Sequence, residues 1–182
     1  MEPNESNDPM QDELFLFDRI WFPKVFKYAR EAGLDWLRMC AAAEILSDGD
    51  PRKRVIDWNF INEFIPSESP VFSTMYDVDG QPSADLIDRG TRWGLFQIVG
   101  QQAIDFGHSG RLVNLIDITK NVQVICNIMT NIINMAEEKS MGISEESYQR
   151  IAEKQLNWPV ELIDSKVSEL KVQMGNLLTF GD

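Results

Sequence analysis

Carboxylates are the side chains of this sequence best suited to proton transfer. Glu44 lies in an apolar run with helical spacing, and Glu68 lies in a loop segment just after Pro66. A carboxyl held in a partly apolar pocket can keep a proton near neutral pH and deliver it as a general acid. The one histidine, His108, lies between glycines without a catalytic partner pattern, and we interpret it as a loop residue. Glu44 and Glu68 are therefore the candidate acids.

Cys40 and Cys126 both lie in apolar helical patterns. Small cysteines in such surroundings usually belong to a hydrophobic core, so we predict two buried free thiols. A disulfide between them stays open as the alternative. The sequence contains no cysteine and histidine cluster with metal-ligand spacing, and we expect neither a metal site nor a cofactor.

Hydrophobic periodicity predicts an all-α, mainly helical domain that would position these residues. The expected helices cover residues 15–32, 35–46, 56–64, 84–90, 94–106, 119–141, a stretch beginning at 144, and 160–178. Asp35 is expected to cap the second helix, and a loop or hairpin is expected over 66–81. We expect residues 1–12 to form a disordered or extended tail and residues 13–182 to form a single domain.

The stretch Thr91-Arg92-Trp93-Gly94-Leu95-Phe96-Gln97-Ile98 resembles the Gly-Leu-Met-Gln-Ile signature of the lytic transglycosylase and goose-type lysozyme family, which cleaves peptidoglycan. Upstream, the segment from Gly33-Leu34-Asp35 to Asp50-Pro51 resembles the family's first catalytic segment, and the two segments align without a gap. Further similar pieces are Gln102-Ala103 to Phe106-Gly107, Leu115-Ile116-Asp117 to Asn121-Val122, and Leu156-Asn157 in the place of a Tyr-Asn pair. The resemblance spans about 26–174 and implies a lysozyme-like fold.

Three positions depart from the family pattern. Leu46 stands where the resemblance puts the catalytic glutamate, Ile125 where it puts a glycine, and Leu156 where it puts a tyrosine. Family members use that glutamate to protonate the leaving oxygen and then as a base, which leucine cannot do. We therefore expect the cleft to have been converted into hydrophobic core. The family-cleft positions of this chain are Leu46, Ser47, Trp93, Gly94, Gln97, Ile125, Leu156 and Asn157.

Two functions compete on this basis. The first is a non-catalytic structural or interaction protein with a lytic-transglycosylase-like fold. The second is a working peptidoglycan hydrolase with a relocated carboxylate, at Glu68 or Glu44. Glu44 is disfavoured because two residues along a helix point the side chain to the opposite face from position 46. A module that only binds peptidoglycan glycan strands is a further alternative.

The charge balance narrows the choice of partner. The chain has 17 basic and 29 acidic side chains, a formal net charge of −12, which argues against nucleic acid and anionic membranes. No run of about 18 apolar residues is present, so we expect no membrane span. The acidic, polar start of the sequence is unlike a secretory signal. We expect a bacteriophage protein, found in the virion or in the host cytoplasm before assembly.

Large apolar residues gather near both ends, beyond the part that best matches the family. They are Leu14, Phe15, Leu16, Phe17, Ile20, Trp21, Phe22, Leu177, Leu178 and Phe180. Clustered apolar groups at a surface usually mark an interface, and aromatic side chains often dominate its energy. We predict that one or both ends dock onto another virion protein or a second copy of the chain. The alternative is that these residues pack on their own domain.

Overall fold

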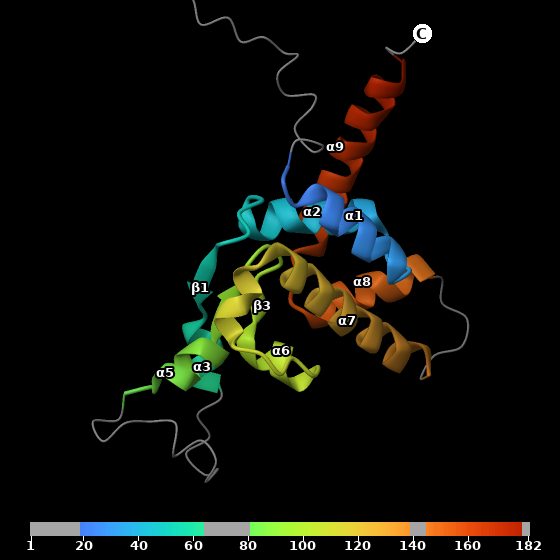
Figure 1. The fold of residues 1–182 in the computed structure, drawn as a ribbon. Coiled ribbons are helices and arrows are strands. Elements are labelled where there is room, and N and C mark those ends of the chain that lie inside the picture. The colour runs from blue at the N-terminus through green and yellow to red at the C-terminus, as the bar shows by residue number, and fades with distance from the viewer. Residues whose placement is uncertain (1–18, 64–80, 139–144, 180–182) are drawn as a thin grey trace, which may run out of the picture.

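The computed structural model describes residues 19–63, 81–138 and 145–179, which are mainly helical, as predicted (Figure 1). The helices are α1 (Phe22–Glu31), α2 (Trp36–Ser47), α3 (Trp58–Glu63), α5 (Ala84–Arg89), α6 (Gly100–Asp105), α7 (Ile118–Glu137), α8 (Glu145–Gln155) and α9 (Val160–Thr179), with a 3-10 helix η2 (Leu112–Ile116). The strands are β1 (Arg54–Ile56), β2 (Thr91–Trp93) and β3 (Ile98–Val99).

Helix α2 runs through the centre of the core. The side chain of Asp35 accepts hydrogen bonds from the backbone N–H groups of Leu37 and Arg38, which confirms the predicted cap. Every residue from Leu37 to Ala43 is buried, because α2 packs against both α1 and α9. Helix α7 packs against α1 and α8 and adds its own apolar stripe, so most of the buried apolar residues belong to one core cluster.

The three strands correct the prediction of a helix over 94–106. They form an antiparallel sheet in the order β1-β2-β3, with Arg54 opposite Trp93 and Arg92 opposite Val99. Helix α6 begins only at Gly100. The physical reason is the turn between β2 and β3, where Gly94 and Gln97 have φ values of +69° and +49°, outside the right-handed helical region. The expected hairpin over 66–81 lies almost entirely outside the described residues.

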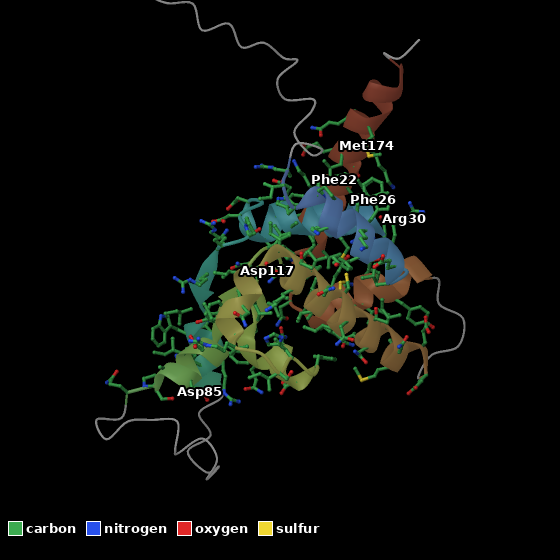
Figure 2. The ribbon with its side chains drawn as sticks, in the orientation of Figure 1. Phe22, Phe26, Arg30, Asp85, Asp117 and Met174 are labelled. Carbon is green, nitrogen blue, oxygen red and sulfur yellow. The ribbon has the colours of Figure 1, made fainter. Side chains whose placement is uncertain are left out.

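The aromatic residues at the start of α1 pack within their own chain. Trp21 is 1% exposed and belongs to the core, while Phe22 stacks on Phe26 at 6.0 Å and meets Trp36 edge-on at 6.2 Å. Figure 2 shows Phe22, Phe26 and Arg30 along α1, and the Arg30 guanidinium lies 5.2 Å from the centre of the Phe26 ring. Trp21 is therefore not available for the predicted terminal docking, and Phe22 is half-buried.

Exposed apolar side chains remain elsewhere near the ends. Ile20 is 75% exposed, and Leu162 and Val172 on α9 are also exposed. The C-terminal part of α9 extends away from the other helices (Figure 1). The side chains of 14–17, Leu177, Leu178 and Phe180 lie outside the described residues. No helix in the described part of the chain is long and apolar enough to cross a membrane.

Candidate functional site

Leu46 and Ser47 occupy the last turn of α2. Leu46 is half-buried and packs against the hydrophobic core. Ser47 is buried, and its hydroxyl donates a 2.8 Å hydrogen bond to the backbone carbonyl of Ala43 one turn earlier. At the position where the resemblance predicts a proton donor, the chain therefore has the hydrocarbon side chain of Leu46. The hydroxyl of the next residue, Ser47, is engaged in a hydrogen bond within α2.

Gly94 is fixed by close backbone approach on two sides. Its N–H donates a 2.8 Å hydrogen bond to the carbonyl of Lys53, which ties the β2–β3 turn to the residue before β1. A Cβ at Gly94 would overlap the carbonyl oxygen of Leu115 and lie 2.5 Å from Nδ2 of Asn121. With φ at +69° as well, glycine is the residue that this position accepts without strain.

Asn121 on α7 holds the turn from the other side. It is fully buried, and its Oδ1 accepts a 3.0 Å hydrogen bond from the N–H of Phe96. Its Nδ2 donates to the carbonyls of Trp93, at 3.0 Å, and Leu115, at 2.8 Å. Gln97 acts in the same way, since its Nε2 donates to the carbonyl of Gly94 at 2.7 Å. The side-chain amides of Gln97 and Asn121 are therefore both engaged with backbone groups.

The other family-cleft positions lie in or beside the core. Trp93, Ile125 and Leu156 are all buried in one cluster, and Nε1 of Trp93 donates to the carbonyl of Asp88 at 3.0 Å. Asn157 has a φ of +55° in the turn between α8 and α9. The structure thus brings the signature turn, α7 and the α8–α9 turn together.

A stacked aromatic pair joins two of these segments. The rings of Phe96, in the signature turn, and Trp158, after Asn157, lie 5.9 Å apart at 15°. Both side chains belong to the buried core. This stacked pair therefore connects the signature turn to the α8–α9 turn.

Glu44, one of the two candidate acids, is paired with a cation. Its Oε1 lies 3.1 Å from Nε of Arg19, and its Oε2 accepts a 3.4 Å hydrogen bond from Nη2 of the same residue. Both carboxylate oxygens of Glu44 are therefore engaged by the guanidinium of Arg19. Glu68, the other candidate, lies outside the described residues.

The two cysteines are free and buried, as the sequence predicts. Burial raises the pKa of the Cys126 thiol to about 12. Burial, with the nearby charges of Glu44 and Asp35, raises the pKa of Cys40 further still. Neither thiol is a nucleophile at neutral pH. In the described part of the chain, no group of three or more histidine, cysteine or acidic residues is arranged to hold a metal ion.

Two cavities among the described residues lie away from Leu46. The larger, of about 410 Å³, lies between the loop after α6 and the first turns of α7, and His108 lines it together with Lys120. The structure places His108 in that loop, as predicted, half-buried. The smaller cavity, of about 260 Å³, lies between the α1–α2 turn, α7 and α8.

A buried charged network that no local sequence pattern predicted joins α2, α8 and α9. Arg38 contacts both Glu153 and Asp164, and the side chain of Gln149 hydrogen-bonds the backbone of Asp35. One signal was present in the sequence, because Arg38 is the only basic residue in the apolar run of α2. Its partners follow more than a hundred residues later, which no local pattern connects to it.

No family model, curated protein or solved structure matches this chain.

Proposed function

We propose that this protein is a non-catalytic structural or interaction protein that uses a lytic-transglycosylase-like helical fold as a scaffold, and that it serves in a bacteriophage virion or tail. The proposal rests chiefly on Leu46. Where the resemblance requires a proton donor, leucine packs on the core at the end of α2. Without a general acid or base, glycosidic cleavage loses at least about 10²–10⁴ in rate.

Other residues singled out from the sequence support the same conclusion. Ile125 and Leu156 are buried apolar residues at the other two positions where the chain departs from the family pattern. The carboxylate of Glu44 is engaged by Arg19, and the amide of Asn121 makes three backbone hydrogen bonds. These polar groups stabilise the fold and are not left available to act on a substrate.

Exposed apolar side chains support a role in interaction. Ile20 precedes α1, Leu162 and Val172 lie on α9, and Trp58 begins α3, and all four are more than half exposed. Large apolar groups that cluster at a surface are typical of protein interfaces, and Leu162 and Val172 lie on the same helix. Because α9 extends away from the other helices, its outer part is well placed for contact with a partner (Figure 1).

A peptidoglycan assay tests the absence of catalysis. Purified full-length protein is expected to release no anhydro-muropeptides or reducing ends above background, beside an active lytic transglycosylase as positive control. Clear release would overturn the proposal in favour of the hydrolase with a relocated acid. Glu68→Gln would then be expected to abolish the activity, and Glu44→Gln serves as the matched comparison.

Light scattering after size-exclusion chromatography tests the interaction role. Leu162→Asp and Val172→Asp replace exposed side chains on α9 and are expected to leave the melting temperature nearly unchanged. If the chain self-associates through α9, these variants shift it to the monomer. A wild-type protein that is monomeric and fails to join phage particles assembled in its presence would contradict the proposal.

A further inference from the structure

Strand β1 (Arg54–Ile56) has one edge with no neighbouring strand among the described residues. It is the first strand in the sheet order β1-β2-β3 and lies between α2 and α3 in the chain (Figure 1). The N–H of Gly94 donates a 2.8 Å hydrogen bond to the carbonyl of Lys53, so Lys53 turns this group toward β2. Alternate residues of a strand in an antiparallel pair point their backbone groups to opposite sides. The N–H and C=O groups of Arg54 and Ile56 therefore face away from β2, toward the free edge.

The same segment exposes large apolar side chains. Val55 is 44% exposed, Ile56 is 41% exposed, and Trp58, the first residue of α3, is 52% exposed. Proteins usually protect an open strand edge by keeping the strand short and placing charged residues on it. Protection alone does not account for three large apolar side chains within four residues, because clustered apolar groups at a surface usually mark an interface. The edge of β1 therefore combines open backbone groups with apolar side chains that a partner would cover.

Positive charge adjoins this edge in an otherwise acidic chain. Arg52 and Arg54 are exposed, and neither forms an ion pair with another described residue, whereas Lys53 between them pairs with Asp48. The guanidinium of Arg54 lies 5.8 Å from the centre of the Trp93 ring. With a formal net charge of −12, copies of the chain repel each other at long range, so contact between copies needs opposite charges at the contact itself. Arg52 and Arg54 therefore favour a partner segment that carries acidic side chains.

Residues 12–18 of this chain have the matching chemistry. They lie outside the described residues, and their sequence is Asp-Glu-Leu-Phe-Leu-Phe-Asp. Acidic residues flank the apolar run at both ends, and residues 1–18 contain six acidic and no basic side chains. In an added strand, Phe15 and Phe17 would share one face, because side chains alternate along a strand. The sequence of this segment therefore matches the edge of β1 both in apolar side chains and in charge.

We propose that residues 12–18 of a second copy of this chain add to the free edge of β1 as a further strand. Their backbone pairs with the outward-facing groups of β1, and their carboxylates meet the guanidinium groups of Arg52 and Arg54. The second copy is the source because, within one copy, the segment directly precedes Arg19, whose guanidinium is held by Glu44 on α2. This inference deepens the proposed interaction role, on which it rests, and is independent of the absence of catalysis.

Charge reversal in the full-length protein tests the pairing of segment and edge. At low salt, the wild-type protein is expected to be larger than a monomer by light scattering. Arg52→Glu with Arg54→Glu reverses the edge, and Asp12→Lys with Glu13→Lys reverses the segment, and each double variant alone is expected to be monomeric. Mixed in equal amounts, the two double variants are expected to associate again, because each segment then meets an edge of opposite charge. Docking within one copy gives no such recovery on mixing.

The matched control is Lys120→Glu with Lys154→Glu, which changes the net charge equally at two exposed residues on α7 and α8. It should associate like the wild-type protein. A monomeric wild-type protein overturns the proposal, and so does association that survives either reversal or is not recovered on mixing. If only Leu162→Asp and Val172→Asp disperse the wild-type assembly, the assignment to β1 is overturned while the proposed interaction role stands.

A proline at position 56 tests the added strand itself. Ile56→Pro removes an N–H that faces away from β2, so the sheet should keep its own hydrogen bonds while association loses one. Ile56→Ala removes the same side chain but keeps the N–H, which makes it the comparison. The proline variant is expected to have a dissociation constant about tenfold higher than that of the alanine variant. Equal dissociation constants, with both melting temperatures close to that of the wild-type protein, overturn the added strand.

Discussion

The guanidinium of Arg38 on α2 donates two hydrogen bonds to the carboxylate of Glu153 on α8, 3.0 Å from Nε and 2.6 Å from Nη2. Both side chains are buried, and Nη1 of Arg38 continues to Asp164 on α9 at 2.6 Å. Burial alone would lower the pKa of Arg38, but its hydrogen bonds to Glu153 and Asp164 raise it above the ordinary value. The guanidinium of Arg38 therefore links α2 to both α8 and α9 through hydrogen bonds.

Breaking this pair from one side is expected to destabilise the protein strongly. Glu153→Gln leaves the Arg38 charge buried with only half-exposed Asp164 as a partner, which should cost about 3–5 kcal/mol of unfolding free energy in urea titrations. The double variant Arg38→Met with Glu153→Leu should recover much of this loss, because it removes both buried charges together. Glu169→Gln, which removes the exposed ion pair with Lys166, is the control and should cost less than about 1 kcal/mol. A small loss for Glu153→Gln would contradict the buried pair.

Gly94→Ala is expected to be among the most damaging single-methyl additions in the chain. The new Cβ would strike the Leu115 carbonyl and the Asn121 amide, in addition to the strain of a positive φ. Gly33→Ala provides a matched control, since Gly33 has nearly the same φ, +71°, and nothing within 4 Å of the added atom. The control should cost about 1 kcal/mol and Gly94→Ala clearly more in thermal unfolding. Equal costs would show that the contacts around Gly94 are unimportant.

Leu46→Glu is expected to restore no glycan cleavage. Ile125 and Leu156 remain buried apolar residues at the two other positions that depart from the family pattern, and no tyrosine is present at 156 to support a carboxyl. Because Leu46 packs on the core while remaining half-buried, the new carboxyl should lower the unfolding free energy by about 1–3 kcal/mol. Leu46→Gln separates the loss of packing from the cost of charge. Measurable peptidoglycan release by Leu46→Glu would instead show that the cleft is still open.

Because of Asp57, the stability of the folded protein is expected to fall as the pH becomes acidic. Burial would raise its pKa, but the backbone hydrogen bond from Phe60 and the ion pair with Arg92 outweigh this, so the pKa lies below the ordinary 3.8. The stabilisation is therefore fully present above the unfolded pKa and is lost as pH falls through the lower folded pKa. Asp57→Asn should lower the melting temperature near neutral pH and reduce the fall in melting temperature between pH 5 and pH 2. An unchanged profile in the variant would rule out this contribution.

The helices could be predicted because their signals are local. Asp35 caps α2 as expected, and the apolar positions of α7 predicted from their spacing, such as Val122, Ile125 and Met129, are buried in the core. These signals lie within a few residues of the structure they specify. Hydrophobic spacing and capping residues are sufficient for such elements.

The sheet could not be predicted because its determinants are distant in sequence. Strands β2 and β3 have three and two residues, and β2 is paired with β1, almost forty residues earlier. The apolar residues around Phe96 have the spacing of a helix, and the positive φ of Gln97, which excludes a helix there, is visible only in the structure. The partner of Arg38 could not be predicted either, because Glu153 lies in a different helix more than a hundred residues later.

Selection for folding alone is enough to keep Gly94 and Asn121 in place. A glycine that admits a neighbouring carbonyl and an asparagine that holds three backbone groups are needed for the chain to close, whether or not any bond in a substrate is cut. Such a pair can therefore persist in a protein without catalytic activity. If the chain descends from a lytic transglycosylase, as proposed above, these two residues record that ancestry and not turnover.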